Sequence, residues 1–152
     1  MTPQELFELA LSYYNGTDNI PQDYLKAYDL FLEAAEAGHI GSQSYLGRML
    51  SMGEGVDRDY AEAVKWLKLA AEAGDSDAQN RLGIRYEYGQ GVEQNYSEAV
   101  KWFKLSAEQD HVKAQVNLAM PPSATKGYRS FWQCCQVLQG CDRTSLYDYI
   151  RS

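Results

Sequence analysis

Basic charge and long apolar runs are scarce in this 152-residue chain, and its first 120 residues contain no cysteine. Lys and Arg number 14 against 21 Asp and Glu, so the chain lacks the positive surface that nucleic acid or anionic lipid selects. No stretch approaches the roughly 18–20 consecutive apolar residues of a membrane span, and the first residues lack the basic start of an export signal. We therefore expect no nucleic-acid partner and no membrane span. A cytoplasmic location is favoured, and periplasmic or secreted locations stay open for a chain whose leader has been removed.

What the sequence does contain is a 36-residue repeat. Residues 45–80 match residues 81–116 at 17 of 36 positions without a gap, a diverged first copy covers residues 9–44, and a fourth begins at residue 117. A period of this length is typical of stacked helical repeats. Each copy contains two stretches whose apolar residues recur three and four positions apart, as in amphipathic helices. We predict an all-α solenoid over residues 1–120, and it must fold by packing alone because it has no cysteine.

Local signals place the ends of these helices. Asp59 and Asn95 offer N-cap oxygens just before the second helical stretch of two copies. Gly74 can adopt the left-handed conformation that ends such a helix. Gly47 and Gly83 stand inside the first helical stretch, where glycine costs about 1 kcal/mol relative to alanine. The repetition of that cost indicates close contact between helices at both glycines.

The repeated residues resemble a known family. The pattern LG..Y..G.GV..(D/N)Y..A..W..(A/S)AE.G is similar to the Sel-one-like repeat (SLR) family, close relatives of the tetratricopeptide repeats. The resemblance implies a right-handed superhelix of antiparallel helix pairs, in which the first helix of each pair lines a concave groove. It also implies an adaptor that binds a protein or peptide. The first copy departs from the pattern, since Ala10-Leu11 stands where Leu-Gly belongs and residues 17–20 replace G.GV, so we expect an irregular first turn.

Two other functions stay open beside the adaptor. Some cysteine-rich members of this family are linked to binding or hydrolysing cell-wall antibiotics, and the lack of cysteine in the repeats argues against that group here. The other alternative is a truncated remnant with no role of its own.

The histidines and cysteines do not combine into a catalytic or metal site. His39 and His111 are 72 residues apart, twice the repeat period, so they occupy the same turn of two repeats and cannot share a metal ion. Cys134, Cys135 and Cys141 lack the paired spacing and the fourth ligand of a zinc site. No Ser-His-Asp or Cys-His set can be assembled. We therefore expect a protein that is not an enzyme and uses no metal or other cofactor.

The candidate binding residues follow from the tetratricopeptide register of the first helix. If Leu82 and Gly83 pack inward, the intervening positions face the groove, and Met52, Ile84 and Tyr88 form an exposed strip suited to a protein or peptide. The alternative is that Ile84 and Tyr88 pack against the next repeat. The predicted groove residues are Ser44, Arg48, Met52, Asp77, Asn80, Ile84, Glu87 and Tyr88, with Ser51, Glu5, Glu8, Ser12 and Asn15 at equivalent positions.

Residues 121–152 differ from the repeats in composition. Residues 1–120 carry 10 basic and 19 acidic side chains, whereas residues 121–152 carry 4 and 2. Pro121-Pro122 ends the helix that Leu118 begins. Two interpretations of this tail stay open: an atypical C-terminal cap, or a fourth repeat read out of frame. We expect a monomer, which would associate through its C-terminal end if that end lacked a cap.

Overall fold

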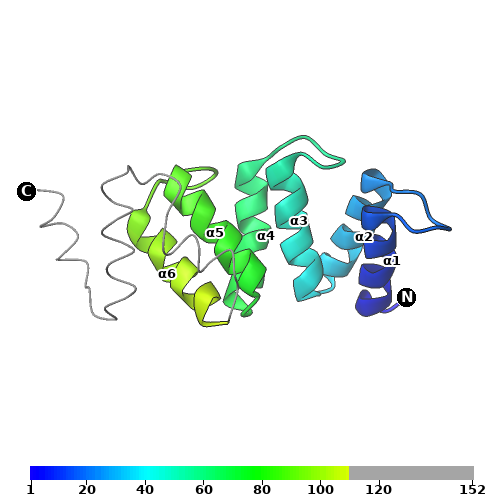
Figure 1. Ribbon diagram of the computed structural model, residues 1–152, viewed down its shortest axis with the longest axis horizontal. Coiled ribbons are helices and arrows are strands. Elements are labelled where there is room, and N and C mark those ends of the chain that lie inside the picture. The colour runs from blue at the N-terminus through cyan, green and yellow to red at the C-terminus, as the bar shows by residue number, and fades with distance from the viewer. Residues whose placement is uncertain (110–152) are drawn as a thin grey trace, which may run out of the picture.

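The structure is a computed structural model that describes residues 1–109, and these residues form six α-helices and no strand. Each helix has 13 residues, and the helices stand side by side in chain order (Figure 1). The predicted all-α solenoid is confirmed. The predicted fourth copy from residue 117 and the tail at 121–152 lie outside the described residues. The helices are α1 (Pro3–Asn15), α2 (Tyr24–Glu36), α3 (Ile40–Met52), α4 (Tyr60–Glu72), α5 (Ser76–Tyr88) and α6 (Tyr96–Glu108).

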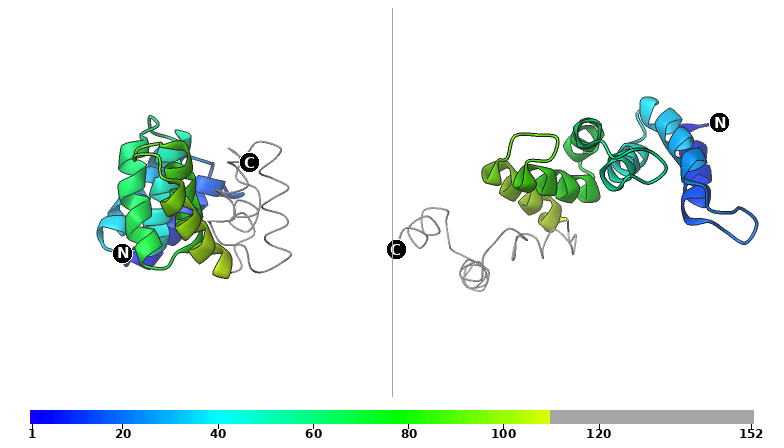
Figure 2. Two further views of the ribbon diagram at one scale, coloured as in Figure 1. Left: turned by 90° about the vertical axis from the view of Figure 1, so that its left-hand side faces the viewer. Right: turned by 90° about the horizontal axis from the view of Figure 1, so that it is seen from above.

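The helices form three successive pairs, α1 with α2, α3 with α4, and α5 with α6. Each helix packs on the next one in the chain, and α3 also contacts α5, the first helix of the following pair. Seen from above, the pairs follow one another along the long axis of the molecule (right view of Figure 2). The contact between α3 and α5 therefore joins the first helices of two successive pairs directly.

Side-chain caps begin the second helix of every pair at the same repeat position. The side chains of Asp23, Asp59 and Asn95 each accept a hydrogen bond from a backbone N–H in the first turn, at 3.1, 3.0 and 3.1 Å. The N-caps predicted at Asp59 and Asn95 are thus confirmed. After α2 and α4 the chain reverses through Gly38 and Gly74, with φ of 89° and 97°, which confirms the left-handed end predicted at Gly74.

The glycines inside α3 and α5 make room for side chains of the paired helix. A Cβ on Gly47 would overlap the Leu67 side chain of α4, and a Cβ on Gly83 would lie 2.7 Å from Phe103 Cε1 of α6. Close contact was predicted here, and the structure shows that the approaching group is a large apolar side chain. The helix propensity lost at each glycine is offset by burying Leu67 and Phe103 completely or nearly so.

The first repeat is one residue longer than the others, which the ungapped comparison of copies missed. The first helices begin 37 residues apart from Pro3 to Ile40, but 36 apart from Ile40 to Ser76. Ala10, buried like Gly47 and Gly83, therefore takes their small-residue position. The expectation that Ala10-Leu11 stands in place of Leu-Gly is wrong, because the equivalent pair is Leu9-Ala10. The extra residue lies in the turn at 16–23, which has eight residues where 53–59 has seven.

The first copy lacks the second glycine of G.GV, and its turn at 16–23 is built differently. In the later copies this glycine lies against the preceding pair: a Cβ on Gly55 would clash with the Tyr24 backbone, and one on Gly91 would overlap the Tyr60 carbonyl. The turn at 16–23 has no second glycine. It closes instead through a reciprocal pair of backbone hydrogen bonds between Thr17 and Ile20, and the irregular first turn is confirmed.

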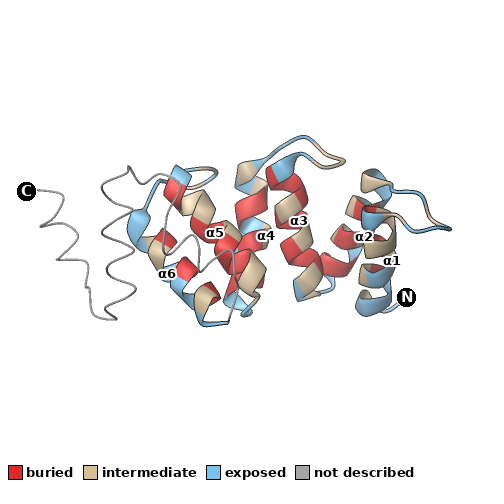
Figure 3. Ribbon diagram, viewed as in Figure 1, coloured by how far each residue is buried: buried red, intermediate tan, exposed pale blue. Residues whose placement is uncertain are grey.

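Two apolar clusters fill the interior, and the buried surfaces of the helices face their neighbours (Figure 3). The first is rich in aromatic rings, with Phe31 stacked on Tyr45 at a centroid distance of 4.9 Å and Tyr14 edge-on to Tyr45 at 5.3 Å. The second is aliphatic, centred on Leu67 and Leu82. Trp66 and Trp102, at equivalent positions of α4 and α6, pack against these clusters, as predicted for aromatic residues at helical spacing.

Candidate partner-binding surface

The first helices place the predicted groove residues in repeating columns. Allowing for the extra residue of the first repeat, Leu11, Arg48 and Ile84 share one position, and Asn15, Met52 and Tyr88 share another. The equivalents predicted in the first copy at Glu5, Glu8, Ser12 and Asn15 are each one residue too late, because the insertion shifts α1. The residues that stand there are Gln4, Phe7, Leu11 and Tyr14.

Two of the predicted groove columns are buried in the structure. Ser44 and Asn80 occupy one column, and Ser51 and Glu87 occupy the other, and all four side chains are buried. The Ser44 hydroxyl donates to Asp75 Oδ1, at 3.2 Å, and the same carboxylate oxygen caps α5 by accepting from the Ala78 N–H. The expectation that Ser44, Asn80 and Glu87 point outward is therefore wrong. On α3, the contact with the start of α5 buries Ser44.

The remaining columns are open to solvent. Met52 is 60% exposed and Tyr88 44% exposed, while Arg48 and Ile84 are partly exposed in the neighbouring column. Asp77 is also partly exposed, and its carboxylate pairs with Arg81 at 2.8 Å. We call Arg48, Met52, Ile84 and Tyr88 the first-helix surface.

A polar cluster that was not predicted holds Arg48 in place. Tyr14 of α1 donates its hydroxyl hydrogen to Glu54 Oε2 at 2.7 Å, and Arg48 Nε lies 3.9 Å from the same oxygen. The Arg48 guanidinium also lies over the Tyr14 ring, 5.3 Å from its centroid. Burial, and then the Glu54 carboxylate, raise the pKa of the Tyr14 hydroxyl above its ordinary value, so Tyr14 stays a donor. The ungapped register of copies concealed this cluster, since it placed Tyr14 one position from its true column.

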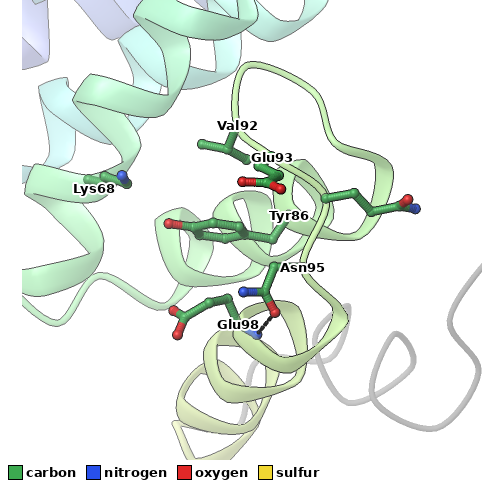
Figure 4. A pocket seen from close by; sticks show the side chains of 7 residues that line it. Lys68, Tyr86, Val92, Glu93, Asn95 and Glu98 are labelled. Atoms are coloured by element: carbon green, nitrogen blue, oxygen red, sulfur yellow. Dashed lines mark hydrogen bonds between the residues drawn. The ribbon is translucent and has the colours of Figure 1, made fainter.

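A pocket of about 470 Å³ opens between the second and third repeats, away from the predicted residues. The Tyr86 side chain projects from α5 into this space, with Lys68 of α4 on one side and the turn before α6 on the other (Figure 4). Lys68 Nζ lies 5.9 Å from the Tyr86 ring centroid, and Glu93 and Glu98 add carboxylates on the facing wall. The pocket is an open crevice of mixed charge between repeats. Its residues carry no sequence pattern that would have marked it.

Both the helix pairs and their repeated contacts have counterparts among known proteins. The sequence profile of the Sel1 repeat matches residues 6–39, 40–75 and 76–111. The chain belongs to the Sel1 repeat family. The predicted family resemblance is thereby confirmed, and Sel1 repeat proteins are in general protein-interaction scaffolds and typically not enzymes.

Solved structures extend the comparison over most of the chain. A protective antigen of uropathogenic Escherichia coli with an SLR fold, c5321, is 35% identical, with a TM-score of 0.74 over 91% of this chain. A Sel1 repeat protein from Oxalobacter formigenes is 26% identical, with a TM-score of 0.72 over 92% of it. The chain spans 31% of the first protein and 59% of the second. Helicobacter pylori cysteine rich protein B shares the fold, with a TM-score of 0.58 at 20% identity over 76% of this chain and 96% of its own.

Two further findings concern what the site contains. Within residues 1–109 no group of three or more histidine, cysteine or acidic side chains is arranged to hold a metal ion, and none of the helices there has the length and apolar character to cross a membrane. Among proteins of curated function, none matches this Sel1 repeat chain.

Proposed function

We propose that this chain is a scaffold that binds a protein or peptide partner across the first-helix surface. The observation that carries the proposal is the exposure of Met52 and Tyr88, which share one position on neighbouring first helices. The columns of Leu46 and Leu82, and of Gly47 and Gly83, keep their residues from one repeat to the next, whereas the buried columns of Ser44 and Ser51 do not. The exposed columns change completely: Arg48 gives way to Ile84.

The second exposed column changes as well, since Met52 of α3 is followed by Tyr88 of α5. A position that contacts a partner meets a different part of it in each copy, so its residue need not repeat. Methionine, tyrosine and arginine are also the side chains enriched in protein interfaces. A partner segment lying across α3 and α5 would bury the exposed apolar area of Met52 and Tyr88 and approach the guanidinium of Arg48.

The alternative of a cell-wall-antibiotic enzyme has no specific observation in its favour. The likeness to the Helicobacter cysteine rich protein, at 20% identity, concerns the fold alone. The three cysteines of this chain lie at 134–141, outside the described residues. The scaffold is therefore the one function that we propose.

The experiment that tests the proposal separates binding from folding. Replacing Arg48 by Ala and both Ile84 and Tyr88 by Ser should abolish capture of the partner from an extract of the source cell, read by mass spectrometry. The melting temperature should stay within a few degrees of the parent value, since exposed positions usually contribute little to stability.

A matched control changes three exposed residues of the second helices: Leu25→Ser, Lys65→Ala and Leu69→Ser. Leu25 and Leu69 are 66% and 50% exposed, so the control removes comparable apolar surface and one positive charge. It should retain capture. Undiminished capture by the first-helix variant, in a protein that melts normally, would contradict the proposal. A large fall in its melting temperature would show that these residues stabilise the stack.

A further inference from the structure

Two arginines converge on one tyrosine at the start of α4. Arg58 Nη1 donates to the Tyr60 hydroxyl at 3.1 Å, and the Arg58 guanidinium carbon lies 5.7 Å from the ring centroid. Arg85, in the last turn of α5, lies over the same ring at 4.8 Å. Two cations on one ring repel each other, and a bound anion would relieve that repulsion.

No carboxylate supplies that anion within the described residues. Of the ion pairs formed within residues 1–109, none includes Arg58 or Arg85. Arg85 Nε is buried there without a hydrogen-bond acceptor. Burial lowers the pKa of the Arg85 guanidinium, and Arg81 and Arg58 lower it further, while Tyr60 acts in the opposite direction. Arg81 itself is neutralised by Asp77. The Arg58–Arg85 pair is thus a partly desolvated positive centre in a chain of net charge −7.

The other repeats show that the fold does not need these charges. At the position of Arg58 the first repeat has Gln22, whose amide donates to the Tyr24 hydroxyl at 3.1 Å, and the third has Gln94, whose amide donates to the Tyr96 hydroxyl at 2.9 Å. Both glutamines also donate to a backbone carbonyl near the end of the first helix. A neutral amide therefore performs the structural role in full.

The position of Arg85 leads to the same conclusion. One repeat earlier it is occupied by Met49, which is completely buried in the first apolar cluster. An apolar side chain can thus fill the space that Arg85 occupies beside the tyrosine of the second helix. Within residues 1–109, Tyr60 is the only one of these tyrosines that has a cation at both the Arg58 position and the Arg85 position.

We propose that Arg58 and Arg85 form a carboxylate-binding site. It binds an Asp or Glu side chain of an acidic segment in a protein partner. Guanidinium forks match the planar carboxylate and can bind it through paired, charge-assisted hydrogen bonds. Most of the surrounding chain repels such a segment, because residues 1–120 carry 19 acidic and 10 basic side chains. The two arginines therefore select where an acidic segment can dock. The site lies at the edge of the solenoid where α4 begins and α5 ends (Figure 1). It would add a second binding site to the first-helix surface.

The test uses variants that the chain itself supplies. The double variant Arg58→Gln, Arg85→Met installs the residues of the neighbouring repeats, and Lys101→Gln, Lys104→Gln removes the same charge from the exposed surface of α6. The probe is a short peptide with blocked ends and two adjacent glutamates, titrated at low ionic strength while the arginine side-chain N–H signals are followed by NMR. The parent protein and the lysine variant should bind with the same affinity, and the arginine variant at least about tenfold more weakly.

Further arms identify the anion and guard against misfolding. The peptide with glutamine in place of both glutamates should not bind, and the arginine variant should melt no lower than the parent. Equal binding by the arginine variant, or no binding by the parent, would overturn the site. A phosphoserine peptide that binds where the glutamate peptide does not would overturn the carboxylate assignment. If the double variant melts far lower than the parent, the two arginines stabilise the fold. The binding comparison is then repeated with the single variant Arg58→Gln, which changes only the exposed arginine.

Discussion

His39 caps α3 with a nitrogen that must stay unprotonated. Its Nδ1 accepts from the Ser42 N–H at 3.1 Å, and its Nε2 lies 3.0 Å from Gln4 Oε1, so the neutral ring donates to Gln4 and accepts from the helix. Burial, beside Phe7 at a centroid distance of 4.5 Å, lowers the pKa of His39 below its ordinary value near 6.5. The side chains contacting the ring carry no charge. Protonation therefore removes the cap and charges a partly buried ring.

This linkage predicts a loss of stability in mild acid. Because the pKa of His39 is lower in the folded than in the unfolded chain, the contribution is present above pH 6.5 and is lost as pH falls through the folded value. Replacing His39 by Asn, the residue that caps α6, keeps an acceptor at every pH. Between pH 7.5 and 5, the free energy of unfolding of the parent should fall by about 1 kcal/mol more than that of the variant. Parallel pH profiles from denaturant melts would show that His39 does not cap in solution.

At the residue scale, the sequence predicted caps where the chemistry is local. Asp59 and Asn95 could be recognised because carboxylates and amides are common N-caps. His39 was predicted only as a turn residue, since its capping role depends on a tautomer selected by Gln4, 35 residues away. Its counterpart His111 lies outside the described residues.

At the scale of elements, the second glycine of each G.GV turn controls how successive pairs approach. Gly91 has a φ of 77°, and its Cα faces the Tyr60 carbonyl so closely that a methyl group would overlap it. Gly74 has a φ of 97° but nothing within 4 Å of where a Cβ would stand. Replacing either glycine strains the backbone, because both have a positive φ. Only at Gly91 would the new side chain also collide with the preceding helix pair.

Substituting each glycine by alanine measures that contact. Gly74→Ala should cost about 1–2 kcal/mol for the left-handed conformation. Gly91→Ala should cost at least about 1 kcal/mol more, because the methyl group must also push the turn away from α4. The two free energies come from urea unfolding of the variants at one temperature. Equal costs would mean that the turn can move away from Tyr60 without loss of packing.

The repeat predicted the type and number of the helices, but it did not predict the register of α1. The apolar period predicted helices at 60 and 96 because it was present in both copies without a gap. The extra residue at 16–23 could not be seen from the sequence. The residues of the first copy that match the later copies all lie after it, from Tyr24 onward. The register of α1 depends on which side chains it buries, including Ala10 and Tyr14, and that is a property of the packed pair.

At the scale of the whole molecule, we expect the repeats to fold without metal or disulfide. The described residues contain no cysteine, and their interior is filled by the aromatic and aliphatic clusters around Phe31 and Leu67. In reductant and chelator, the far-UV circular dichroism spectrum should stay helical and melt cooperatively. A coil spectrum under these conditions would contradict folding by packing alone.

The candidate surface was only partly predictable because exposure depends on neighbouring repeats. Met52 and Tyr88 are exposed as predicted, whereas Ser44, Asn80 and Glu87 are buried. The register of a single helix cannot distinguish a position that faces solvent from one that faces the next first helix. That distinction appears only when α3 and α5 are stacked.

The binding face of the solenoid is the central claim, and site-specific photo-cross-linking tests it most directly. A photoreactive phenylalanine would replace Met52 or Tyr88 on the first helices, and Leu25 or Leu69 on the second helices, which are exposed to a similar degree. After irradiation in the source cell, adducts are identified by mass spectrometry. The account predicts one recurrent protein or peptide partner cross-linked from 52 and 88 and absent from 25 and 69. A recurrent partner cross-linked from 25 and 69, and not from 52 and 88, would contradict it.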